Sequence, residues 1–454
     1  MIFILLLTIG SLHASDTDNF VIDASKIDED SIESFDDTQF VGSAEDVKVE
    51  KSQDSSNNVK SFSDLAQEIE NTKKGSVLVL DGKYKFDPKE DGQYKNGIFI
   101  TKSIKIVGKN NCTIDGNGKA RIFKLESHCK LTLKHIKFTR GYSKGSNGGA
   151  LFSYSHCVII IKNCGFTRNV AFKANGGAIA SGAHSVVDIR DSKFYYNKAL
   201  RSSDKAWPKD QRGMGGVLDI NIGSKLILHN SIFKENQGYL SIILVMSQTD
   251  KGTKTSTADV KNCLFERNAA AINGVFYLDE YGKGTFTKSV FKKNFSRDKG
   301  ATLVLDASKS ALVKNCRFEK NVGVFGGAID LLKYNKYVSH VSVVDCSFIK
   351  NKAKQVGGAI YSEHGRLKIV TSKFIKNKAG VSGGAVEVRG GKLNMVKPLF
   401  KQNSAQCGGA VLVKDKKGIH SYKAKFIKNR ATVDGKNILA IFNHHVSKIK
   451  ILTK

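Results

Sequence analysis

Short apolar runs that alternate with polar residues are the dominant pattern along the chain. Residues 185–189 (Ser-Val-Val-Asp-Ile), 225–228 (Lys-Leu-Ile-Leu) and 365–370 (Gly-Arg-Leu-Lys-Ile-Val) show it clearly. A period of two that is bounded by Gly, Asn, Asp and Ser predicts strands and turns rather than helices. The pattern therefore favours an all-β protein.

A repeat organises these runs. Ten copies of Phe-x-x-Asn form a regular series between residues 166 and 429, with Phe-to-Phe steps of 28, 39, 32, 26, 27, 30, 26, 26 and 26 residues. A step of this size holds three short strands and three turns, which is one coil of a parallel β-helix, and we expect a solenoid of roughly 12–14 coils. The pairs are Phe166/Asn169, Phe194/Asn197, Phe233/Asn236, Phe265/Asn268, Phe291/Asn294, Phe318/Asn321, Phe348/Asn351, Phe374/Asn377, Phe400/Asn403 and Phe426/Asn429.

Each position of the repeat has a predicted structural role. The Phe points into the bore and stacks on its equivalents above and below, and the Asn forms a polar ladder at a turn. Gly-Gly pairs such as Gly357-Gly358 and Gly383-Gly384 permit a bend with positive φ. The small residue that follows them, Ala or Val, leaves room at the inner corner.

The chain divides by charge and hydrophobicity. Residues 1–14 resemble the apolar region of a secretory signal, too short to cross a bilayer. Residues 15–60 hold 13 acidic and four basic side chains, a net charge of −9, and we expect a disordered leader there. The rest of the chain therefore has a net charge of +39, and the whole chain has a net charge of +30. We expect export and no transmembrane span.

We expect the β-helix to span residues 76–454, with a cap over its first coil and none evident over its last. Residues 61–75 predict a short helix, capped by Ser63, with an apolar stripe of Leu65, Ala66 and Ile69. It would cover the open end of the bore, where unpaired strand edges invite aggregation. Residues 449–452 end the chain without an evident cap, which leaves end-to-end self-association open.

Four of the eight cysteines lie two residues before the repeat Phe, where other coils have Ser. Cβ atoms stacked about 4.8 Å apart are too distant for a disulfide, which favours about 3.8 Å, so we expect buried free thiols. Cys112 and Cys129 are left as a candidate bridge. The four are Cys164, Cys263, Cys316 and Cys346.

A basic row is the strongest candidate for binding. Two residues after the repeat Phe, most coils carry Lys or Arg, and stacked like charges repel unless a polyanion lies along them. The alternative is a solvated outer turn. Tyr196 and Gln402 interrupt the row, and Lys234 stands one place early. Its members are Arg168, Arg267, Lys293, Lys320, Lys350, Lys376 and Lys428.

The 39-residue step contains an insertion that is a second binding candidate, because long loops on one coil of a solenoid often carry function. It holds the only Trp of the chain. Its candidate residues are Arg201, Lys205, Trp207, Lys209 and Arg212. We expect an acidic polysaccharide, glycan or cell-wall polymer as partner and no specific nucleic acid, because stacking aromatic residues do not interleave with the row.

Catalysis would need clustered carboxylates. Asp219, Asp330 and Glu387 share one register, three residues past the second Gly, but Asp330 and Glu387 lie two coils apart, about 10 Å. We expect them to be solvated side chains that balance lysines. His420, His444 and His445 lack a metal-ligand spacing, and no metal or cofactor is expected.

The combination of Gly-Gly-Ala-Ile and Phe-x-x-Asn repeats over residues 61–440 resembles the passenger regions of chlamydial polymorphic outer-membrane proteins. The first coil, residues 75–123, with Ile-x-Ile-x-Gly at 104–108 and Thr-Ile-Asp-Gly at 113–116, resembles adhesin-like β-helix proteins of methanogenic archaea. The resemblance implies a right-handed parallel β-helix that is secreted or at the cell surface, with an adhesive role.

Three functions of different classes therefore remain. The first is a non-enzymatic, exported adhesin-like protein that binds acidic polymers through its basic face. The second is a polysaccharide lyase or hydrolase, with Asp330 and Glu387 as the candidate carboxylates. The third is a structural component of the cell envelope.

Overall fold

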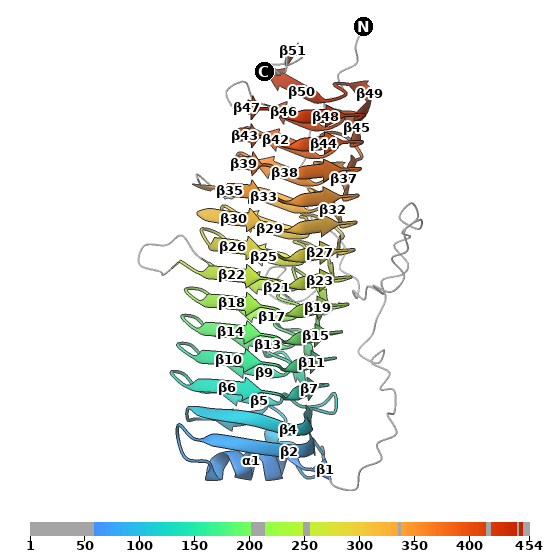
Figure 1. Cartoon of the computed structure of the whole chain (residues 1–454). Helices are drawn as coiled ribbons and strands as arrows, with labels where there is room; N and C mark the ends of the chain where they lie inside the picture. The colour runs from blue at the N-terminus through green and yellow to red at the C-terminus, as the bar shows by residue number, and fades with distance from the viewer. Residues whose placement is uncertain are drawn as a thin grey trace.

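The computed structural model describes residues 59–200, 214–247, 255–334, 337–414, 419–442 and 445–447. There the chain winds into a tall stack of coils that rises from α1 (Phe62–Asn71) at one end (Figure 1). A representative coil runs through β10 (Val158–Lys162), β11 (Gly165–Thr167), β12 (Val170–Phe172) and β13 (Ile179–Ser181). Each strand pairs with its equivalent in the next coil, which confirms the predicted parallel β-helix.

Three sheets form the faces of the stack. The β10-type and β11-type strands make a 25-stranded sheet, the β12-type strands an 11-stranded sheet and the β13-type strands a 15-stranded sheet. In the last, only β34 (Tyr337–Val338) and β51 (His445–Ser447) pair antiparallel. The other 13 strands contribute one rung per coil, within the expected number of coils.

The repeat phenylalanines stack through the bore as predicted. From Phe138 to Phe426 each ring lies 4.6–5.2 Å from the next, with interplanar angles of 20° or less. Phe138 therefore begins the series, although its coil has Gly141 where the others have Asn. The stack runs through the single main apolar core.

The asparagines form the predicted ladder. The Asn351 amide Nδ2 donates to Oδ1 of Asn377 at 3.0 Å and to the Phe318 carbonyl of the preceding coil at 3.0 Å. The Asn351 backbone N–H donates to the same Asn377 Oδ1. The same bonds recur from Asn169 onward, so every buried amide of the ladder is satisfied, which burial requires.

The two glycines of each Gly-Gly pair have different reasons to be glycine. Gly357 has φ of 63°, the left-handed region that only glycine enters without strain. At Gly358 a Cβ atom would come within 2.1 Å of the Gly384 carbonyl oxygen. The first glycine is therefore needed for the backbone bend. The second is needed because a side chain there would clash with the backbone of the neighbouring coil.

The capping helix forms, but its N-cap is Ser61 and not Ser63. The Ser61 hydroxyl accepts from the Asp64 N–H, and the Asp64 carboxylate accepts from the Ser61 N–H, a reciprocal capping box. The Ser63 hydroxyl instead donates to Asp91 at 2.9 Å. Leu65 and Ile69 are buried, as the apolar stripe predicts, and α1 lies across the first coils (Figure 1).

At both ends of the solenoid the structure differs in detail from the prediction. Val59 and Lys60, assigned to the acidic leader, form β1 and pair with β2 (Val77–Lys85); residues 1–58 lie outside the described residues. At the other end, β51 folds back antiparallel on β50 (Ile438–Phe442). That edge of the sheet is thus covered, whereas residues 449–452 are not described.

All eight cysteines are free. Cys164, Cys263, Cys316 and Cys346 are buried, as predicted, and Cys112 and Cys129 do not form the candidate bridge. Burial raises the pKa of the Cys112, Cys164 and Cys263 thiols to about 12. These thiols pack as small apolar side chains and are poor nucleophiles.

Candidate functional site

The basic row lies at a turn where the backbone is left-handed. Its seven members have φ between 51° and 56°, a region that non-glycine residues rarely occupy. They are Arg168, Arg267, Lys293, Lys320, Lys350, Lys376 and Lys428, which we call the turn row. Lys350, Lys376 and Lys428 are exposed. Arg140, in the Phe138 coil, has φ of 50° and occupies the same position, although the repeat did not include it.

A second left-handed turn lies one strand earlier in every coil and provides a comparison. There the residue is Asn or Asp in six coils, as at Asn163, Asp191 and Asn230, and Lys in three, at Lys288, Lys397 and Lys423. Asn and Asp tolerate positive φ because their short side chains bond locally. Lys and Arg have no such compensation, yet they are more frequent at the turn-row position than at this one.

The turn row is partly neutralised in the lower coils. The left-handed position that follows Lys234 is Glu235, whose carboxylate lies 3.8 Å from Lys234 Nζ and 3.7 Å from Arg267. Arg168 lies over the Tyr196 ring, 5.7 Å from its centroid. The uninterrupted run of lysines therefore extends from Lys293 to Lys376, and Gln402 separates Lys428 from it.

The predicted loop candidates Arg201, Lys205, Trp207, Lys209 and Arg212 lie outside the described residues. Their role stays a prediction from the sequence.

The three candidate carboxylates are buried, so their expected solvation is wrong. Asp219, Asp330 and Glu387 lie on β17 (Leu218–Ile220), β33 (Ile329–Tyr334) and β42 (Val386–Arg389), and are 3% exposed or less. They point away from the bore, but the row Phe325, Val356 and Ser382 packs over this face: Phe325 contacts Tyr361 and Ser382 bonds Glu387. The sequence could not show this covering, because it comes from the segment before each Gly-Gly.

Of the three buried carboxylates, Asp330 has the fewest hydrogen bonds. Neither carboxylate oxygen has a hydrogen-bond partner, and burial together with the charges of Glu363 and Asp306 raises its pKa well above the usual range. Nearby, the Tyr277 hydroxyl donates to Asp306 at 2.8 Å. Burial also raises the pKa of Asp219 to about 6. Such groups favour the protonated, uncharged form.

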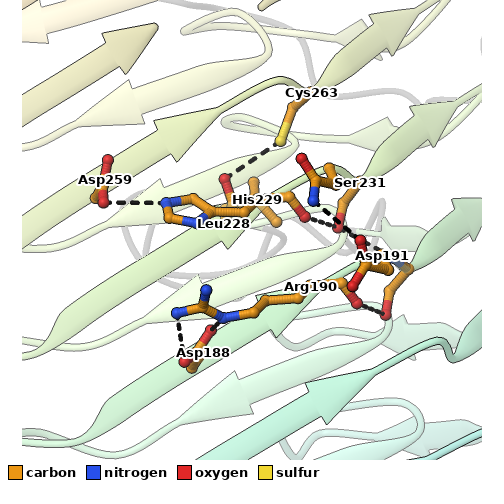
Figure 2. Close-up of polar contacts among 10 residues, drawn as sticks. Asp188, Arg190, Asp191, Leu228, His229, Ser231, Asp259 and Cys263 are labelled. Atoms are coloured by element: carbon orange, nitrogen blue, oxygen red, sulfur yellow. Dashed lines mark hydrogen bonds and ion pairs between the residues drawn. The ribbon is translucent and has the colours of Figure 1, made fainter.

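The outer face of the 25-stranded sheet changes its charge along the stack. In the lower coils, on β14 (Val186–Arg190), β18 (Lys225–His229) and β22 (Thr257–Lys261), carboxylates lie beside some of the basic side chains (Figure 2). Arg190 binds Asp188 at 2.8 Å and the His229 ring lies 3.0 Å from Asp259. This part of the face therefore carries acidic as well as basic side chains.

Further up, the same face is hollowed and its cations are unbalanced. A hollow of about 490 Å³ spans β26 (Lys283–Thr287), β30 (Ser310–Lys314), β35 (His340–Val344), β39 (Arg366–Val370) and β43 (Lys392–Val396). No carboxylate lines it. Within the described chain, Arg366, Lys368 and Lys392 have no acidic partner. We call this the basic hollow; its basic lining residues are His340, Arg366, Lys368 and Lys392.

Sequence reasoning missed these four residues because it followed the strict repeat. His340, Arg366 and Lys392 are aligned across three coils, since His340 pairs with Arg366 and Arg366 with Lys392. The sequence does contain a pattern that could have indicated them, because three successive five-residue strands begin with a basic residue.

Of the three histidines considered, His420 is exposed on β47 (Ile419–Tyr422), and the side chains of His444 and His445 are not described. Among the described residues, no three His, Cys, Asp or Glu side chains are grouped so that they could hold a metal ion. In the same part of the chain no helix has the length and hydrophobicity of a membrane-spanning segment.

Comparison with known proteins agrees with the fold. A family model described as a right handed beta helix region matches residues 126–318, and the Chlamydia polymorphic membrane protein repeat matches residues 345–363. No curated protein matches the chain. One similar solved structure is a mannuronic acid specific polysaccharide family 6 lyase enzyme from human gut microbiota. It has 11% identity, covers 81% of this chain and 82% of its own, and has a TM-score of 0.33, too low to support a functional argument.

The chain is thus a right-handed parallel β-solenoid. More particularly, it carries a repeat similar to that of Chlamydia polymorphic membrane proteins.

Proposed function

We propose that this protein is an exported, non-enzymatic adhesin-like protein that binds acidic polymers or glycans through its basic outer surface. The observation that carries the proposal is the turn row. Its Lys and Arg residues adopt a left-handed backbone in coil after coil, and each such residue costs about 1 kcal/mol relative to glycine. The coil imposes the same conformation on Tyr196 and Gln402, so what supports a function is the repeated choice of Lys and Arg at a position that does not favour them.

The charge distribution supports the same function. The chain has a net charge of +30, and Lys350, Lys376 and Lys428 present exposed cations on the upper coils. A polyanion that lies along the stack would relieve their mutual repulsion. Binding is expected to be electrostatic and therefore to weaken as salt rises.

The test is to incubate the full chain with a panel of acidic polysaccharides and to measure both retained polymer and newly formed chain ends. Salt-sensitive retention without new ends is the expected result. An absence of retention on every polymer would overturn the proposal, and deletion of residues 201–212 tests whether the Trp207 loop contributes.

A second candidate is a polysaccharide-cleaving enzyme, favoured by the buried, unpartnered Asp330 near Asp306 and Glu363. A carboxylic acid whose pKa is raised by burial is the kind of group that a general acid requires. New chain ends that disappear in Asp330→Asn would support this candidate. The third, a structural envelope component, predicts concentration-dependent assembly in sedimentation velocity.

A further inference from the structure

The basic hollow has the composition of a binding site and not only of a charged surface. Besides its cations, it is lined by the polar side chains of Thr285, Ser342 and Asn394, and by Leu312. These four occupy one column with Lys368, since each pairs with the next across β26, β30, β35, β39 and β43. Hydroxyl and amide groups beside cations match the hydroxyls and acidic groups of a sugar chain.

An aromatic pair stands at the end of the strands that form the hollow. The Tyr281 and Tyr337 ring centroids are 5.0 Å apart at 69°, and Lys309 lies 5.1 Å from the Tyr281 centroid. Tyr281 precedes Gly284 of the lining by three residues, and Tyr337 precedes His340 by three. Tyr337 belongs to the β33–β34 hairpin, the antiparallel addition to this coil. Tyrosine offers both an apolar face and a hydroxyl to a sugar.

The spacing of the cations fits an extended acidic chain. His340, Arg366 and Lys392 are in register on three successive coils, so their strands lie about 4.8 Å apart, a distance comparable to one sugar unit. In the lower coils of the same sheet Arg190 is paired with Asp188 and the His229 ring contacts Asp259 (Figure 2), whereas no carboxylate lines the hollow. The charge of the hollow is therefore free for an external anion.

We infer that the basic hollow is the site at which this protein binds an acidic glycan, a chain of carboxylated or sulfated sugars that lies across β35, β39 and β43. The inference rests on the proposed function and refines it, because it moves the main contact from the turn row to the outer face of the 25-stranded sheet. Tyr281 and Tyr337 flank the chain, and Arg366, Lys368 and Lys392 pair with its acidic groups.

The experiment compares two triple variants of the full chain that each remove three positive charges. R366Q/K368Q/K392Q empties the hollow of its permanent cations, whereas K350N/K376N/K428N removes the same charge from the turn row. Binding to a polyuronate and to a sulfated glycan is measured by titration at low salt, with single-stranded DNA as the non-glycan polyanion. All substituted side chains are exposed, and thermal unfolding checks the fold of both variants.

The hollow variant is expected to lose about tenfold or more in glycan affinity, and the turn-row variant about twofold or less. Tyr281→Ala should weaken glycan binding without changing DNA binding. The polyuronate and the sulfated glycan distinguish the two sources of negative charge. Equal losses in both triple variants, or equal effects on glycan and DNA, would overturn the inference while leaving the proposed function intact. No binding by the unaltered protein would instead overturn the proposed function.

The pH dependence of glycan binding tests the role of His340 separately from the loss of positive charge. Burial and the neighbouring Arg366 lower the pKa of His340; Arg366 and Lys368 on β39, Lys392 on β43 and Lys309 before β30 are the charged groups around it. It is therefore neutral at neutral pH and gains a proton in acid. Glycan affinity should rise as the pH falls below about 6.5, the ordinary pKa of histidine, and this rise should be absent in His340→Gln.

Discussion

Asn351 donates its side-chain amide to the Oδ1 of Asn377 at 3.0 Å, and this one contact joins two successive coils. Asn351 Oδ1 in turn accepts from the backbone N–H and the amide of Asn321, at 3.1 and 3.0 Å. Asn351→Ala leaves these buried donors without an acceptor, so we expect a loss of about 1–3 kcal/mol of stability. Chemical unfolding measures it, with Lys373→Ala on the exposed surface as control. An equal effect of the two substitutions would contradict a structural role for the ladder.

Phe374 packs between Phe348 and Phe400, at centroid distances of 4.7 and 4.8 Å. Phe374→Ala opens a cavity in the bore and should destabilise the protein by about 3–5 kcal/mol. Phe374→Leu retains much of the volume and loses mainly the ring contacts, so it should cost less. Thermal unfolding of the two variants compares the effect of the cavity with that of the lost ring contacts. A larger loss of stability in Phe374→Leu than in Phe374→Ala would contradict the role of the stack.

The strain in the turn row predicts an uncommon combination of effects. In K350N/K376N/K428N each new Asn accepts positive φ more readily than Lys, so the variant should be at least as stable as the unaltered protein. It also loses three charges and should bind acidic polymers less salt-dependently. Thermal unfolding and a salt titration measure the two properties. A clear drop in stability would show that the lysines brace the turn.

The buried carboxyls make stability depend on pH. The pKa of Asp219 is about 6 in the folded chain, above its usual unfolded value near 4. The folded state therefore holds more protons in this window, and stability falls as pH rises from about 4 to about 6. Asp330 acts in the same direction. Asp330→Asn should reduce this slope and raise the melting temperature at neutral pH; an unchanged slope would show that Asp330 is solvated.

The buried thiols should resist alkylation in the native protein. Seven of the eight cysteines are buried and Cys407 is half-buried, and burial raises the pKa of Cys407 as well as that of Cys112. A thiolate-directed reagent should modify at most Cys407 until denaturant is added. Mass spectrometry counts the modified sites. Rapid labelling of Cys164 in the native state would indicate that the stack opens locally.

The sequence predicted the elements whose residue types recur in every coil. Phe374, Asn377 and Gly383 repeat at a fixed step, so the bore, the ladder and the bend were all visible without a structure. The cap was misplaced by two residues because Ser61 and Ser63 both suit an N-cap. The capping box that Ser61 forms with Asp64, and the bond from Ser63 to Asp91, distinguish the two in the structure.

The candidate site was less predictable, because it depends on which residues meet across coils. His340, Arg366 and Lys392 fall outside the repeat, and their register follows from strand lengths that the sequence leaves uncertain. The burial of Asp330 depends on Phe325 and Val356, which lie before the Gly-Gly bends and pack back over its sheet. Such long-range covering leaves no local pattern in the sequence.

The asparagine ladder has a direction, and this bears on the order in which the molecule assembles. From Asn169 to Asn403 the backbone N–H and one side-chain N–H of each Asn donate toward the following coil, while the other side-chain N–H donates back to a Phe carbonyl of the preceding coil. Asn429 donates to Phe400 and to Asn437. A newly formed coil therefore presents open donors that only its successor can satisfy. Growth from α1 toward the carboxy terminus adds one acceptor at a time to a prepared template, so a chain that emerges amino terminus first can fold as it arrives.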